Sequence, residues 1–288
     1  MPGRFRQWQG DERSSVLMPP AATANDLTAC AVAVLTDADP AGKAERARRM
    51  AGDWAQGRIA GLGRASPPSR PARPAQPQLK RPGDMPKRKI NRGIAGRFAL
   101  LHALAHIELN AIDLACDIVA RFPQEGLPDA FYDDWLRVAE EEAKHFLLLE
   151  ERLGELGGAY GDLPAHDGLW QAAEDTAGDL LARLAVVPLV LEARGLDVTP
   201  AMIAKLKAVD DHRSAGVLEI IYRDEVGHVA IGKRWFDHLC QRDGVDPRQT
   251  WQDLVRRHFK GQLKPPFNED ARQQANLPPD FYTALTEL

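Results

Sequence analysis

Two short stretches, Glu142-Ala-Lys-His145 and Glu225-Val-Gly-His228, decide how this chain folds. In each of them a glutamate precedes a histidine by three residues, a spacing that puts both side chains on one face of an α-helix. A carboxylate and an imidazole on one helical face can bind the same metal ion. One such pair arises readily by chance in 288 residues, so the argument depends on where the two pairs lie.

Each pair is preceded by another glutamate at nearly the same interval. Glu108 lies 34 residues before Glu142, and Glu192 lies 33 residues before Glu225. The break at Pro123 to Pro128 falls midway between Glu108 and Glu142, so a helical hairpin that turns there puts their carboxylates at the same height. All four glutamates lie among apolar residues, where burial of an unpaired carboxylate costs several kcal/mol.

Four carboxylates from four helices, with two imidazoles, form the ligand set of a carboxylate-bridged pair of metal ions. The predicted ligands are Glu108, Glu142, His145, Glu192, Glu225 and His228. Mixed oxygen and nitrogen ligands favour iron, with manganese as an alternative and zinc as an ion acquired on purification. The competing interpretation assigns these residues to surface salt bridges, and their apolar neighbours argue against it.

Three more side chains are candidates for supporting the predicted ligands. Asp224 and Glu141 each directly precede a Glu-x-x-His pair. A carboxylate in that place can hydrogen-bond the imidazole of the opposite pair and fix its tautomer. Simple solvation within a run of three glutamates is an equal alternative for Glu141. Tyr222, on the same predicted helix as Asp224, is either a hydrogen-bond donor to the site, a redox-active residue or a tyrosine of the core, and the last is favoured.

The chain around these residues shows helical periodicity without the alternation of β-strands. Long helices are expected over residues 94–121, 129–156, 168–194 and 211–242, and shorter ones over 27–35, 41–54, 200–209 and 248–259. Pro188 and Gly195 predict that the third long helix bends or ends near Glu192. The predicted fold is all-α, and its divisions are an N-terminal tail and helical extension (1–60), a Pro/Arg-rich strap (61–93), a four-helix bundle (94–243) and a C-terminal helical extension (244–288).

Composition excludes several protein classes. With 44% hydrophobic and 27% charged residues, the chain can bury a core and is not disordered throughout. No apolar run approaches the roughly 20 residues of a membrane span, and the N-terminus lacks the apolar segment of a secretory signal. The 3 cysteines are far apart and form neither a disulfide framework nor a thiolate zinc site. These features predict a cytoplasmic protein with no membrane partner.

The net charge of −4 averages two unlike parts. Residues 64–97 contain ten basic residues and one acid, which gives this strap +9 and leaves −13 on the rest of the chain. A basic strap can contact the phosphates of a nucleic acid, but it can equally lie against the acidic surface of its own protein. The second alternative is favoured, so nucleic acid is an open and less favoured partner.

The doubled motif resembles the ferritin-like superfamily of di-iron carboxylate proteins over residues 94–243. The sequence most resembles an uncharacterised bacterial ferritin-like family, domain of unknown function four-five-five, and it is more distantly similar to the ferritin-like tRNA hydroxylase. The stretches that carry the resemblance are His102-Ala-Leu-Ala-His106-Ile-Glu108-Leu-Asn-Ala-Ile-Asp113, Glu192-Ala-Arg-Gly-Leu-Asp197 and Lys264-Pro-Pro-Phe-Asn268. The resemblance implies a ferritin-like four-helix bundle with a di-iron site, and it names no substrate.

The expected function is that of an oxygen-activating hydroxylase or related oxidoreductase with a small-molecule or modified-nucleoside substrate. Such a centre also needs electrons, so an electron-donor protein is a further expected partner. A ferroxidase or iron-handling protein is one alternative, and a metal-stabilised binding protein without catalysis is another. A monomer or dimer is expected in place of a 24-subunit shell, because the strap and C-terminal extension obstruct shell assembly.

Overall fold

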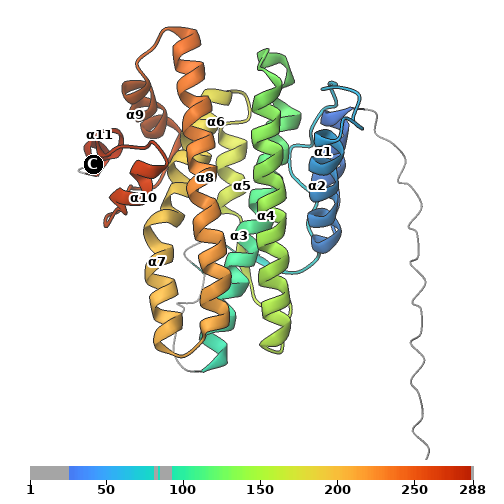
Figure 1. Ribbon diagram of the computed structural model, residues 1–288, viewed down its shortest axis with the longest axis vertical. Coiled ribbons are helices and arrows are strands. Elements are labelled where there is room, and N and C mark those ends of the chain that lie inside the picture. Colours follow the sequence, from blue (N-terminus) through green and yellow to red (C-terminus); the bar gives the residue numbers. More distant parts are fainter. Residues whose placement is uncertain (1–25, 81–83, 85–92, 287–288) are drawn as a thin grey trace, which may run out of the picture.

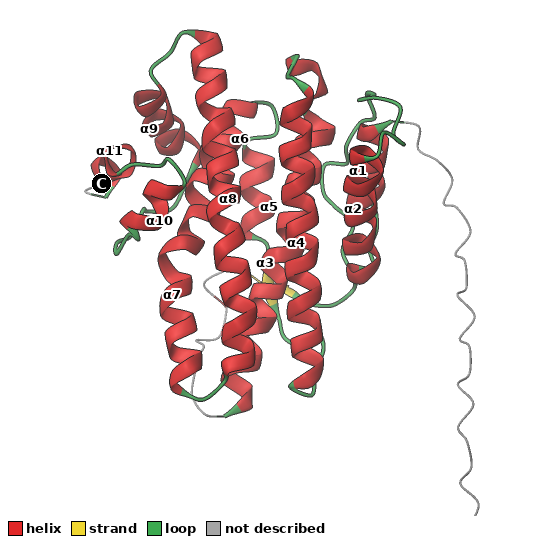
Figure 2. Cartoon of the chain, in the orientation of Figure 1, coloured by secondary structure: helices red, strands yellow, loops and turns green. Residues whose placement is uncertain are grey.

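The computed structural model describes residues 26–80, 84 and 93–286, and this part of the chain is predominantly helical (Figures 1 and 2). The tail expected over residues 1–24 lies outside the described residues. Within the described ranges, strand structure is limited to a parallel pairing of β1 (Leu79–Lys80) with β2 (Ala165–His166). No helix in these ranges is both long and apolar enough to cross a membrane.

Three uninterrupted long helices lie side by side at the centre of the molecule (Figure 1). They are α3 (Ile94–Arg121), α4 (Asp129–Glu155) and α8 (His212–Asp243), and the predicted bounds are confirmed to within one residue. Helices α3 and α4 form the predicted hairpin, and α8 packs against α4. Gly126 turns the hairpin with a φ of 66°, a left-handed conformation that glycine adopts without steric cost.

The segment predicted as the third long helix is interrupted, and here the predicted helix bounds were wrong. The sequence predicts one helix over 168–194 and a separate helix over 200–209. The structure instead has a short helix α5 (Gly168–Asp175), followed by a continuous run of α6 (Leu180–Val186), a π-helical turn η3 (Val187–Glu192) and α7 (Ala193–Ala208).

A local N-cap explains the first difference, and a contact from a distant part of the chain explains the second. The side chain of Asp179 accepts a hydrogen bond from the backbone N–H of Ala182, and this N-cap starts α6 after the chain breaks at residues 176–179. Pro200 does not stop α7, although it cannot donate to the carbonyl of Leu196 four residues earlier. That carbonyl accepts instead from Nδ2 of Asn268 at 3.1 Å, so the helix continues without an unpaired backbone group.

Two N-terminal helices cover α3 and α4 on one side of the molecule (Figure 1). They are α1 (Leu27–Leu35) and α2 (Pro40–Ala55), close to the predicted bounds. The side chains of Asp26 and Asp39 accept hydrogen bonds from backbone amides in the first turns, so each helix has an N-cap.

Two described cations of the basic strap are paired with acids of their own chain. Arg70 forms ion pairs with Asp167 and Glu174, and Arg73 pairs with the fully buried Asp113. These contacts agree with the favoured alternative for the strap, in which it lies against its own protein. The remaining strap cations that are outside the described residues are Arg81, Lys87, Arg88, Lys89 and Arg92.

The C-terminal extension packs on the opposite side of the molecule, against the interrupted segment and α8 (Figure 1). It contains α9 (Pro247–His258), close to prediction, and α10 (Glu269–Gln274), which was not predicted. It ends with α11 (Pro279–Tyr282), where Pro279-Asp280 in the sequence indicates the start of a last helical turn. Nε1 of Trp251 donates to the carbonyl of Ala185 at 3.0 Å, at the end of α6 where the π-helical turn begins.

Candidate metal centre

The six residues selected by spacing come together between the four long segments. Glu108 comes from α3, Glu142 and His145 from α4, Glu192 from the end of η3, and Glu225 and His228 from α8. One side-chain oxygen or nitrogen from each of Glu108, Glu142, His145 and Glu225 lies within 4.8 Å of the other three. Glu192 lines the same cavity as the other three glutamates.

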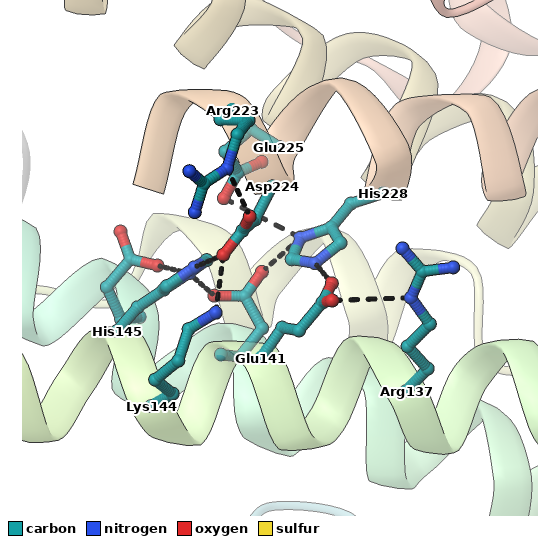
Figure 3. A network of polar contacts seen from close by, with 10 residues as sticks. Arg137, Glu141, Lys144, His145, Arg223, Asp224, Glu225 and His228 are labelled. Carbon is teal, nitrogen blue, oxygen red and sulfur yellow. Dashed lines mark hydrogen bonds and ion pairs between the residues drawn. The ribbon is translucent and has the colours of Figure 1, made fainter. Parts of the chain in front are cut away.

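His145 connects the carboxylate cluster to an acid on another helix. Its Nδ1 lies 3.4 Å from Oε2 of both Glu108 and Glu142, and its Nε2 lies 3.1 Å from Oδ2 of Asp224 (Figure 3). The side chain is fully buried. A carboxylate that accepts the Nε2–H proton fixes the neutral ring in the tautomer whose Nδ1 lone pair faces the cluster.

His228 repeats this arrangement with the roles of the two helices exchanged. Its Nε2 lies 2.8 Å from Oε2 of Glu141, while Nδ1 lies 3.0 Å from Glu142 and 3.8 Å from Glu225 (Figure 3). The acid that precedes each Glu-x-x-His pair thus contacts the histidine of the other pair. This is the geometry that the sequence suggested for Asp224 and Glu141.

The two outer carboxylates also contact cations at the protein surface. Nζ of Lys144 lies 2.5 Å from Asp224, and Nε of Arg137 lies 3.3 Å from Glu141 (Figure 3). Although burial alone raises the pKa of Asp224, hydrogen bonds from Lys144 and His145 lower it to about 2. Asp224 is therefore ionised at neutral pH and can accept a hydrogen bond from Nε2–H of His145. Neither Lys144 nor Arg137 was selected from the sequence, because no pattern marks a salt bridge around a site.

The protonation of the buried cluster reflects an excess of carboxylates. Burial and the charge of Glu142 raise the pKa of Glu108 well above its usual range, and burial and Glu225 do the same for Glu192. Burial lowers the pKa of His145, but hydrogen bonds to Glu108 and Glu142 outweigh it and raise the pKa to about 10. Protons compensate the buried negative charge, as a cation would.

Four ligand atoms are inaccessible to solvent and make no well-formed hydrogen bond to the described residues. They are Oε2 of Glu108, Oε1 of Glu142, Oε2 of Glu192 and Nδ1 of His228. Nδ1 of His228 lies 3.0 Å from Oε1 of Glu142, and Nδ1 of His145 lies 3.4 Å from Oε2 of Glu108, so Oε2 of Glu192 is the atom for which the described residues supply no polar contact. A buried cluster of carboxylate oxygens and imidazole nitrogens fits divalent metal ions, so the residues present match the group that the sequence implies.

The π-helical turn places Glu192 at the cluster. Pro188 lies within this turn, which accommodates the missing backbone donor that breaks a regular helix. Helix α8 approaches the turn closely at Gly232, where an added Cβ would lie 2.3 Å from Cβ of Pro188. The absence of a side chain at Gly232 thus lets Glu192 and the α8 ligands face each other.

Tyr222 does not contact the predicted ligands by hydrogen bonding. Its hydroxyl accepts from Nδ2 of Asn268 at 2.8 Å, and the backbone N–H of Asn268 donates to the buried Asp197 at 3.0 Å. Arg272 binds both oxygens of Asp197, each at 2.8 Å. This network ties the C-terminal extension to α7 next to Glu192. Sequence reasoning missed the contact, although Asp197 and Asn268 end two of the stretches quoted for the family resemblance.

A cavity of about 180 Å³ reaches the carboxylates from the side of α3, α5 and α7. Glu108, Glu142, Glu192 and Glu225 form its acidic part. The rest of the lining is almost entirely aliphatic. Sequence reasoning did not identify this cavity, because its walls come from separate helices and each wall residue looks like ordinary core.

Comparison with known proteins places the chain in a family. Residues 36–283 match the family model described as "Protein of unknown function (DUF455)". The chain is also 46% identical over 211 residues to an uncharacterized protein of Haemophilus influenzae, and the match covers 70% of this chain and 72% of the relative. No solved structure matches the chain. The chain therefore belongs to the DUF455 family of proteins of unknown function.

Proposed function

We propose that this protein has a ferritin-like four-helix bundle that binds two iron ions, and that it is an oxygen-dependent oxidoreductase, most simply a hydroxylase of an organic substrate. The observation that carries the proposal is the repeated histidine geometry. In both Glu-x-x-His pairs the imidazole Nε2 contacts a carboxylate from the opposite helix and Nδ1 faces the buried glutamates. Carboxylate-oriented histidines of this kind are typical of metal ligands.

The ligands divide between the two metal positions according to the histidines. Glu108 and His145 would hold one ion, and Glu192 and His228 the other, with Glu142 and Glu225 between them. The contacts of His145 with Glu108 and Glu142, and of His228 with Glu142 and Glu225, support this division, and Glu192 is assigned to the second position because it lines the cavity together with Glu225. Glu142 is the residue that both histidines approach, which favours it as a bridging carboxylate.

A bound pair of iron ions supplies oxygen activation and electron storage. Hydroxylation of a C–H bond consumes one O₂, two electrons and two protons, and it yields the alcohol and one water, so an electron donor is required. The protein's own residues hold the site in position. Asp224 and Glu141 orient the two imidazoles, and the aliphatic cavity excludes water while leaving room for an organic molecule beside the carboxylates.

The cavity favours a substrate-processing enzyme over iron storage. A storage protein needs a path for hydrated ions, and such ions are poorly accommodated by aliphatic walls. Here the carboxylates are reached through a cavity whose walls are aliphatic, as in most sites for small organic ligands.

The proposal is tested by anaerobic addition of Fe²⁺ to metal-free protein, followed by oxygen. We expect two iron ions per chain and an absorption band in the near-ultraviolet that develops with oxygen. Glu142→Ala and His228→Ala should abolish the band and lower the iron content, whereas Glu219→Ala, at an exposed position on α8, should change neither. Full iron content and an unchanged band in both site variants would refute the ligand assignment.

A further inference from the structure

We infer that the cavity beside the carboxylates binds a small monocarboxylic acid with a hydrocarbon body, and that Arg194 binds its carboxylate at the entrance. The inference names the substrate class of the proposed oxidoreductase, so it rests on that proposal for its catalytic meaning. The binding itself is argued from the cavity and is testable without catalysis.

The walls of the cavity define the body of the ligand. Apart from the four glutamates, the lining side chains with polar atoms are Thr199 and Arg194. The aliphatic walls come from four helices (α3, α5, α7 and α8) and include Leu104, Leu114, Leu169, Val198, Met202 and Leu218. A hydroxyl or amide placed against these walls would lose its hydrogen bonds to water without replacement, so the part of the ligand that they enclose is a hydrocarbon.

The volume limits the size of that body. An engineered protein cavity of about 150 Å³ lined by aliphatic and aromatic residues holds one benzene molecule. The cavity of about 180 Å³ therefore has room for one substituted aromatic ring or a short alkyl chain. It is too small to enclose a complete nucleoside, whose base and ribose would also meet no hydrogen-bonding partners on the aliphatic walls.

The charge at the entrance defines the other end of the ligand. Ile107 is 36% exposed and the Arg194 side chain is 42% exposed, so these two residues mark where the cavity meets solvent. Arg194 is the one cation in the lining. Its Nη1 donates to the carbonyl of Lys264 at 2.7 Å and weakly to Asp197 at 3.4 Å. In the described part of the chain Nε and Nη2 have no such partner, so two donors of the planar guanidinium are available.

A carboxylate matches these donors better than a phosphate does. Two parallel N–H donors of one guanidinium fit the two oxygens of one carboxylate, and the single positive charge balances its single negative charge. A doubly charged phosphate ester would carry an uncompensated charge at an entrance that has one arginine. The ligand is therefore an acid of hydrocarbon character, held with its carboxylate outward and its C–H bonds toward the glutamate cluster.

The C-terminal extension shapes this entrance. The Lys264 carbonyl that fixes Arg194 belongs to the Lys264-Pro-Pro-Phe-Asn268 stretch, and Asn268 is bonded to Asp197 on the same helix as Arg194. Two of the sequence stretches that support the family resemblance thus meet beside the cavity. Their contact gives Arg194 a defined position. Because the side chain is already ordered, ligand binding loses less free energy to the entropy cost of fixing it.

The test measures binding by isothermal titration calorimetry on the full-length protein as purified, with the metal content determined in parallel. The probes are phenylacetate and hexanoate, with 2-phenylethylamine and 2-phenylethanol as cationic and neutral analogues of similar size. We expect both acids to bind, the amine not to bind, and the alcohol to bind about tenfold more weakly than phenylacetate.

Three variants at two cavity positions and one matched control make the test specific. Arg194→Gln should weaken both acids about tenfold and leave the alcohol unchanged, and Arg194→Lys should recover part of that loss. Val198→Phe fills the cavity and should abolish binding of all probes. Lys205→Gln removes an exposed cation from the same helix outside the lining and should have no effect.

Equal binding of acid and amine, or acid binding that Arg194→Gln leaves unchanged, would overturn the inference. Protein that holds two metal ions per chain but binds neither acid would refute the substrate class and leave the proposed function standing. Protein that binds the acids through Arg194 but takes up no metal would refute the proposed function and leave the binding site standing.

Discussion

Glu192→Met should stabilise the metal-free protein while it reduces metal binding. Oε2 of Glu192 is inaccessible to solvent and has no hydrogen-bond partner among the residues that the structure describes, and the charges of Glu225 and Glu142 add to the cost of burial. An unsatisfied buried polar group costs about 1–3 kcal/mol, and methionine fills a similar volume without a polar atom. For a protein of this size about 1 kcal/mol shifts the Tm by roughly 2–4 °C, so the Tm should rise by roughly 2–12 °C.

The assay is differential scanning calorimetry of chelator-treated protein, with and without two equivalents of Mn²⁺ or Zn²⁺. The Tm of wild-type protein should rise when metal is added, because a ligand that binds the folded state stabilises it. Glu192→Met should gain less and retain about one ion per chain by elemental analysis. Glu219→Met, at an exposed position, should leave the free energy of unfolding of the metal-free protein within about 0.5 kcal/mol of wild type, so its Tm should be nearly unchanged. A lower metal-free Tm with unchanged metal content in Glu192→Met would refute the reasoning.

Three further expectations follow from the same contacts. Hydrogen bonds to two glutamates outweigh burial and raise the pKa of His145 from 6.5 to about 10. The bound proton therefore stabilises the metal-free fold in full below pH 6.5, and this stabilisation is lost as the pH rises toward 10. Metal must displace that proton, so metal affinity should rise with pH over this window; calorimetry in buffers of different ionisation enthalpy should detect the released proton, and no release would contradict the assignment. Gly232→Ala should destabilise the protein by about 1–3 kcal/mol, because the added Cβ would lie 2.3 Å from Cβ of Pro188. The control is Gly216→Ala on the same helix, whose added Cβ meets nothing within 4 Å and which should be neutral or stabilising. Similar Tm values for the two variants would be contrary evidence. Asp224→Asn should weaken metal binding about 10–100-fold in competition with a chelator, and unchanged affinity would show that this carboxylate does not support the site.

Much of the candidate site was predictable because, in an α-helix, the number of residues between two side chains determines whether they lie on the same face. Glu142 and His145 share a helix, and any regular helix puts residues three apart on one face. The midpoint turn brought Glu108 to the level of Glu142 for the same reason. Both steps need only local structure and a hairpin, and the bounds of α3 and α4 confirm them.

The interrupted segment was less predictable because a distant part of the chain decides it. Pro188 and Pro200 both predict a break in a helix considered alone. The π-helical turn accommodates Pro188, and the carbonyl that Pro200 leaves unpaired accepts a hydrogen bond from Asn268, 72 residues from Leu196. No local pattern contains that contact, so the sequence predicted a bend or an end near Glu192, where the helix passes through a π-helical turn and continues.

The sequence by itself determined the all-α class, the long helices and the six residues that converge, because each follows from periodicity and spacing within single helices. Tertiary structure alone decided which imidazole meets which outer carboxylate, how the π-helical turn places Glu192, and that an aliphatic cavity with Arg194 at its entrance reaches the glutamates. These features depend on the relative positions of helices far apart in the chain. Packing sets those positions through contacts such as Gly232 against Pro188, which no periodicity encodes.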